Sequence, residues 1–207
     1  MNLEEMISIW NTKYCDEKVA PQTYSSQIND IYNYLSTTDN FEAVLAFLSR
    51  ASVPKSKGRY DDLMIAIKRN LIRKCKDVVD DKSPEPVILA RFAQFRDKIV
   101  VDEIRKVLVS VAPKCYRGIE AFCSKMDVDK KQLTTDLLSQ SWNKDNVQSL
   151  IHIADHLYGL DVEKITDKII EIGDEKAIKK YMEKCIDLKG VTKLQEALKQ
   201  LEKGTEV

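Results

Sequence analysis

The chain has 207 residues, with 33 Lys and Arg balanced by 33 Asp and Glu, and it contains only six Gly and five Pro. The zero net charge gives no overall preference for nucleic acid or membrane, and the scarcity of glycine and proline argues against a strand-rich fold with many tight turns. No apolar run is long enough to span a bilayer, and the start, MNLEEMISIW, lacks the basic and apolar regions of a signal peptide.

The cysteines indicate a reducing compartment. They are odd in number, widely separated and lack any CxxC pair: Cys15, Cys75, Cys115, Cys123 and Cys185. Such cysteines are typical of small buried apolar residues and not of a disulfide framework or a structural zinc site. We therefore expect a cytoplasmic protein, with a nuclear or perinuclear one as the alternative.

In the N-terminal half, apolar residues recur at three- and four-residue steps, which is the spacing of amphipathic helices. Expected helices are a short one on Leu3–Trp10, one that starts at Pro21 and runs through Leu35, one opened by a capping box of Asp39 and Glu42, and a long basic one over 63–79. Residues 51–59, ASVPKSKGR, form a polar connector that is either a sub-boundary or a loop between repeats. We expect one helical array over 1–207.

The segment from Ile99 to Val111 is ambiguous by composition. It is rich in β-branched residues, which favour strands. Charged residues such as Asp102 and Arg105 interrupt any alternation, whereas Ile104, Leu108 and Val111 keep helical spacing. We therefore predict a deeply buried helix.

In the C-terminal half, the predicted helices follow each other at a regular interval. One is expected to open at Pro113, three at the capping residues Asp129, Asp145 and Asp161, and the last over Val191–Leu201. Within Leu157–Cys185, Gly173 is expected to end one helix in a left-handed conformation, and Asp174 to cap the next. From residue 129 onward the helix starts are about 15 residues apart, and no tetratricopeptide or ankyrin consensus recurs. The predicted fold class is therefore all-α, an irregular HEAT-like repeat array of antiparallel helix pairs.

The residues that carry chemistry do not form a recognisable catalytic pattern. His152 and His156 are the only histidines and lie four apart on one predicted helix, a spacing that can place two imidazoles on one metal ion. The glutamate of the H-E-x-x-H motif is replaced by Ile153, and the sequence offers no evident third ligand. We predict no catalytic residue, metal site, cofactor or small-molecule substrate, and keep a histidine–metal enzyme as the remotest alternative.

The one electrostatic feature is a local excess of positive charge over 51–80. Such a stripe can hold phosphates without reading bases; a solvated helix face is the alternative interpretation. The candidate RNA- or phosphate-binding residues are Lys55, Lys57, Arg59, Lys68, Arg69, Arg73, Lys74 and Lys76.

A pattern in the last third resembles a known family. Leu157-Tyr158-Gly159-Leu160-Asp161 is followed by a helix of spaced isoleucines, then by Asp174-Glu175-Lys176-Ala177 and Tyr181. This is similar to the helical N-terminal domain of the Nibbler/mutator class of three-prime-to-five-prime exoribonucleases, which process small RNAs. The resemblance implies a HEAT-like domain that binds partners or RNA, with catalysis in a separate acidic-residue domain whose motifs this chain lacks.

From these observations we expect a non-catalytic interaction domain that docks protein partners and RNA backbone in a small-RNA processing or silencing pathway. The main rival is a protein–protein scaffold unrelated to RNA. Neither interpretation involves a membrane.

Overall fold

The computed structural model describes residues 1–16, 21–55, 58–95, 98–185 and 187–204. These residues form an all-α protein in which the described segments contain no strand. None of their helices is both long and apolar enough to cross a membrane. The α-helices are α1 (Leu3–Ile9), α2 (Ser25–Thr37), α3 (Phe41–Arg50), α4 (Gly58–Lys76), α5 (Glu85–Phe92), α6 (Lys98–Val111), α7 (Arg117–Cys123), α8 (Lys130–Leu138), α9 (Val147–His156), α10 (Val162–Ile172), α11 (Glu175–Lys184) and α12 (Leu188–Gly204).

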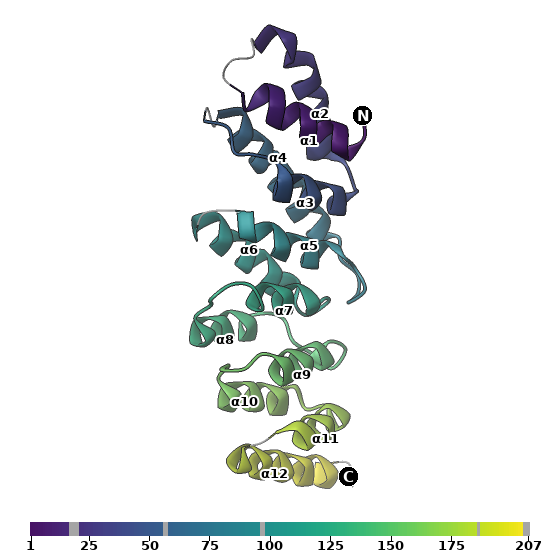
Figure 1. Ribbon diagram of the computed structural model, residues 1–207. Coiled ribbons are helices and arrows are strands. Elements are labelled where there is room, and N and C mark those ends of the chain that lie inside the picture. The colour runs from purple at the N-terminus through teal and green to yellow at the C-terminus, as the bar shows by residue number, and fades with distance from the viewer. Residues whose placement is uncertain (17–20, 56–57, 96–97, 186, 205–207) are drawn as a thin grey trace.

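The helices stack in two columns, and the two ends of the chain lie at opposite ends of the stack (Figure 1). One column runs α2, α4, α6, α8, α10, α12, each helix in contact with the next in that order. In the other column, α1, α3, α5 and α7 follow one another, and α9 contacts α11. Most helices therefore pack on the helix two positions away, and many also pack on a neighbour in sequence, as α5 does on α4 and α6.

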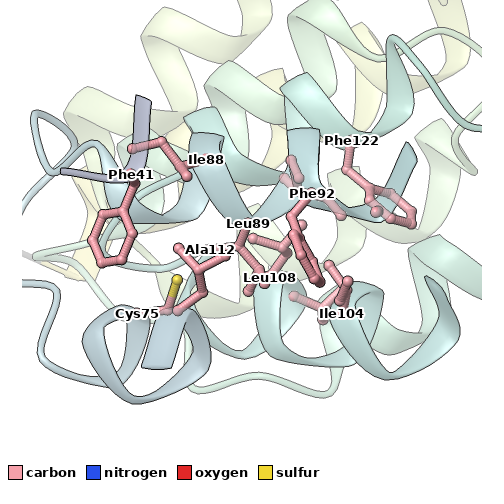
Figure 2. Packing of buried hydrophobic residues seen from close by; sticks show 14 of the residues in the cluster. Phe41, Cys75, Ile88, Leu89, Phe92, Ile104, Leu108, Ala112 and Phe122 are labelled. Atoms are coloured by element: carbon pink, nitrogen blue, oxygen red, sulfur yellow. The ribbon is translucent and has the colours of Figure 1, made fainter. Parts of the chain in front are cut away.

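A single hydrophobic core runs along the stack between the columns. It reaches from Met6 in α1 to Leu198 in α12. Figure 2 shows its central part, where Phe92 of α5 lies among side chains of α6 and α7 that include Leu108 and Phe122. Both aromatic side chains are buried. Because burial of one such side chain contributes about 1.5–3 kcal/mol, this stripe-on-stripe packing is the main source of stability.

Ion pairs join helices two positions apart on the outside of both columns. In each pair one helix contributes a cation and the other a carboxylate. Those of one column are Lys68–Glu103 (2.5 Å), Arg105–Asp136 and Lys193–Asp167 (2.8 Å); those of the other are Arg50–Glu4 (2.5 Å), Arg91–Glu42 (2.7 Å) and Lys184–Asp155. Most of these side chains are partly exposed, so each pair adds only about 0.2–1 kcal/mol.

Several local predictions are confirmed. Asp129, Asp161 and Asp174 each accept backbone N–H groups at a helix start, and Gly173 ends α10 with φ of +67°. The segment 98–111 is a helix, and all five cysteines are free thiols. The indole N–H of Trp142 donates to the carbonyl of Leu137 at 2.6 Å, which holds the turn after α8 against the core.

Two predicted helix caps are wrong. Asn40, and not Asp39, caps α3: its side-chain oxygen accepts the N–H of Ala43 at 3.2 Å, while the Asp39 carboxylate pairs with Lys74. Asp145 does not cap α9 either. The residue at that position is Asn146, whose side chain accepts from the N–H of Asn143 instead.

Four predicted helix boundaries are also wrong. The second helix starts at Ser25, because Pro21 lies in a separate short 3-10 helix, Pro21–Thr23. The basic helix starts at Gly58 and ends at Lys76, so Val79 lies beyond it and is 81% exposed. Pro113 lies in a turn whose N–H groups bond back to Val109 and Val111, and α7 starts only at Arg117. The last helix starts at Leu188, because the Asp187 side chain accepts the N–H of Gly190.

Candidate functional site

The predicted cationic residues lie on α4 and on the connector before it, but they do not share one surface. Lys57 lies outside the described residues, and Lys55 is exposed on the connector. Arg59 donates to the side chain of Asn29 in α2. Lys68 pairs with Glu103 at 2.5 Å and Lys74 with Asp39 at 2.9 Å. These last two cations are neutralised within the protein, so they are poor candidates for holding a phosphate.

The remaining three cations of α4 form a continuous exposed row. Arg69, Arg73 and Lys76 are spaced by four and three residues, which places them on one face of the helix. The Arg73 guanidinium donates to Asn70 at 2.9 Å, and Asn70 donates to the carbonyl of Thr38 at 3.3 Å. Within the described segments no carboxylate pairs with any of the three. We call these three residues the α4 cationic row.

A second cluster contains three polar side chains, of which the sequence analysis identified only two. It lies between α7 and α9 and consists of Glu120, His152 and His156. One carboxylate oxygen of Glu120, Oε1, lies 3.7 Å from Nε2 of His152 and 3.8 Å from Nδ1 of His156. One possible metal-ligating atom from each residue lies within 4.8 Å of the others. Glu120 thus supplies the third possible metal ligand, which the sequence alone did not reveal beside the two histidines.

Local helix geometry explains how the two imidazoles meet. Residues four apart on α9 lie one above the other, so the two rings stack with centroids 4.0 Å apart and an interplanar angle of 27°. The Tyr116 ring, at the start of α7, also packs on His152, with the two ring centroids 4.1 Å apart. Nδ1 of His156 lies 2.9 Å from the carbonyl oxygen of His152. The position of His152 is therefore held by contacts with two neighbouring rings.

The electrostatics of this cluster are unusual for surface residues. Oε1 of Glu120 is buried and makes no hydrogen bond in the described part of the protein. Burial raises the pKa of Glu120, an effect that the neighbouring His156 and Arg117 oppose. Burial also lowers the pKa of His152, and His156 and Lys184 lower it further. Oε1 of Glu120, which no hydrogen-bond donor contacts, thus faces the His152 imidazole, whose pKa is lowered.

The sequence contains only half of the signal for this cluster. The four-residue spacing of the histidines was visible, but Glu120 precedes His152 by 32 residues and sits on another helix. Nothing in local spacing connects the two, because the contact depends on how α7 and α9 pack.

No family model, no curated protein and no solved structure matches this chain. The two clusters of side chains must therefore be interpreted from their own chemistry.

Proposed function

We propose that this chain is a non-catalytic interaction domain, built as a HEAT-like helical array, that binds its partner along the outer surface of the stack. The apolar stripes of the helices are buried in the internal core. The solvent-facing sides of both columns carry mostly charged and polar residues. An elongated surface of this kind is the feature that helical arrays use for binding.

The partner that we propose is RNA, held by its phosphate backbone on the α4 cationic row. The observation that supports this is the exposure of Arg69, Arg73 and Lys76 on one face without a neutralising carboxylate among the described residues. Guanidinium groups suit phosphate because they donate two parallel hydrogen bonds. The described surface of α4 presents no row of aromatic side chains, so we expect backbone binding without base selectivity.

The setting that we propose is small-RNA processing in the cytoplasm, beside a catalytic exoribonuclease domain. Its support is the resemblance of the Leu157–Tyr181 region to the N-terminal domain of the Nibbler/mutator class. A protein partner that docks on the same array is part of this proposal, because the resemblance implies a HEAT-like domain that binds partners or RNA.

The experiment measures the affinity for RNA at several salt concentrations. The readout is the fluorescence anisotropy of a labelled single-stranded RNA. Three phosphate contacts should give a slope of about −2 in a plot of log K against log salt, or roughly a 20-fold loss of affinity between 50 and 200 mM salt. The triple variant Arg69→Glu, Arg73→Glu, Lys76→Glu should abolish this binding.

The matched control makes the same change of charge elsewhere, with Lys131→Glu, Lys176→Glu and Lys199→Glu on α8, α11 and α12. These lysines are exposed, and the control should keep most of the affinity. Equal loss in both triple variants would mean that only net charge matters, and the specific role of α4 would be wrong. No RNA binding in the parent protein would leave the scaffold unrelated to RNA as the better interpretation.

A further inference from the structure

The cluster between α7 and α9 has the composition of a metal site and not of an ordinary surface ion pair. Two imidazoles and one carboxylate are the ligand set of many mononuclear zinc sites that keep an open coordination position. The same set holds other divalent transition metals. A surface ion pair would place the carboxylate oxygen within hydrogen-bond distance of its partner, whereas here Oε1 of Glu120 stays 3.7 and 3.8 Å from both nitrogens.

We propose that Glu120, His152 and His156 bind one divalent transition-metal ion, of the Zn²⁺ type, at the junction of α7 and α9. The ion would accept one oxygen from α7 and two ring nitrogens from α9, and the remaining position would face solvent on the side of His156. This inference is independent of RNA binding on α4.

Two of the three distances between ligand atoms need only a small contraction to hold the ion. Ligand atoms that are bound at about 2.0–2.1 Å in tetrahedral geometry lie about 3.3–3.4 Å from one another. The two carboxylate–imidazole distances of 3.7 and 3.8 Å exceed this by up to about 0.5 Å, and the two imidazole nitrogens, which lie within 4.8 Å of each other, approach further when the His156 ring turns. The His156 side chain is 50% exposed and can make this adjustment, although coordination through Nδ1 replaces its contact with the carbonyl of His152.

The site also explains the buried oxygen of Glu120. A buried carboxylate oxygen without a hydrogen bond is unfavourable, since burial removes its water. A metal ion would supply the missing partner. The Tyr116 ring, which packs on His152 at 4.1 Å, would fix one ligand ring before the ion binds.

Three cations lie near the cluster; one of them is paired with a carboxylate, and the other two are hydrogen-bonded to neutral groups. Lys184 pairs with Asp155, and Lys180 donates to Gln148 at 2.7 Å. Arg117, on α7, donates to the backbone carbonyl of Asp81 at 3.4 Å. The Asp155 carboxylate, which pairs with Lys184, lies 3.9 Å from Nδ1 of His156, so the charge of this ion pair next to the site is balanced. The negative charge of Glu120 is then the one that attracts the cation.

The test is calorimetric titration of the full chain with Zn²⁺ after treatment with EDTA and removal of the chelator. We expect one ion per chain. Glu120→Gln, His152→Asn and His156→Asn should each weaken binding at least about tenfold, since even loss of an outer-shell partner typically costs 10–100-fold in affinity. Circular dichroism of each metal-free variant shows whether it is folded, and Glu120→Gln is the variant least expected to perturb the fold.

Two controls locate the ion. Glu175→Gln makes the same change of charge on exposed α11 and should keep the parent affinity. A variant with Cys15, Cys123 and Cys185 changed to Ser should also keep it, and the Co²⁺ complex of the parent should show visible ligand-field bands without thiolate charge transfer.

The chain has only two histidines, so the double variant His152→Asn, His156→Asn leaves no imidazole ligand anywhere. Stoichiometric Zn²⁺ binding that survives in this double variant would overturn the proposal. Absence of stoichiometric binding by the parent would overturn it equally. Neither result bears on RNA binding, which the α4 variants test separately.

Discussion

Nζ of Lys68 in α4 lies 2.5 Å from Oε2 of Glu103 in α6, and only 16% of the Lys68 side chain is exposed. This lysine is one of the cations that sequence analysis assigned to phosphate binding. In the folded protein it instead joins two helices that are stacked in the same column. Its neighbour Arg69, the next residue on the same helix, is exposed.

Because Lys68 is paired with Glu103 and Lys76 is not paired with a carboxylate among the described residues, we expect opposite effects on stability and RNA binding when each lysine is replaced. Lys68→Gln should lower the free energy of unfolding by about 0.2–1 kcal/mol, because it removes an ion pair between helices, and should leave RNA binding nearly unchanged. Lys76→Gln should weaken RNA binding and leave stability unchanged. Denaturant unfolding and anisotropy on both variants check this; equal weakening of RNA binding by the two would contradict it.

Gly118 in α7 lies where two helices approach most closely. A methyl group added there would come within 2.5 Å of the Pro86 Cβ in α5 and within 3.0 Å of the Leu108 Cδ2 in α6. We expect Gly118→Ala to destabilise the protein by about 1–3 kcal/mol through overpacking, measured by denaturant unfolding. Gly58→Ala, at the start of α4, meets nothing within 4 Å and should not destabilise it. An unchanged stability of Gly118→Ala would show that α5 and α7 pack less tightly than described.

Helix capping separates two aspartates that look alike in the sequence. The Asp174 side chain accepts the N–H of Ala177 at 2.6 Å, so Asp174→Ala should cost about 1 kcal/mol of stability. Asp145→Ala should cost little, because Asp145 does not cap α9. Thermal melts of the two variants measure the difference, and an equal loss in both would contradict the assigned caps.

Acid should weaken the stack through the carboxylates of its ion pairs. Hydrogen bonding to Lys184 lowers the pKa of Asp155, and hydrogen bonding to Arg105 and then Lys106 lowers the pKa of Asp102. A carboxyl group whose pKa is lower in the folded state binds fewer protons than in the unfolded state, so it stabilises the fold at neutral pH. That contribution is lost as pH falls below the ordinary aspartate pKa of 3.8 and through the lower folded value.

The corresponding measurement is the melting temperature between about pH 5 and pH 2. Asp155→Asn should be less stable than the parent at neutral pH, and the difference should shrink in acid. Asp30→Asn, on the exposed face of α2, serves as the control and should follow the parent curve. A difference for Asp155→Asn that stays constant with pH would show that its ion pair with Lys184 does not contribute.

The local sequence pattern was sufficient to predict which segments of this chain form helices. Apolar residues at three- and four-residue steps produce amphipathic helices wherever the rest of the chain lies, and Gly173 and Asp174 end and start helices through bonds to their own neighbours. The ambiguous segment 98–111 was resolved as a helix for the same reason. The boundaries at Pro113 and Val79 were missed, because turns that bond back to a preceding helix end leave no periodic pattern.

Tertiary packing alone decided which side chains meet across helices. Lys68 and Arg69 are adjacent cations in the sequence, yet one faces Glu103 and the other faces solvent. Glu120 joins His152 and His156 only because α7 and α9 place their side chains within a few ångströms. Periodicity describes one helix at a time, whereas contacts between residues that are 32 apart depend on how two helices are oriented, and that orientation is set by the whole core.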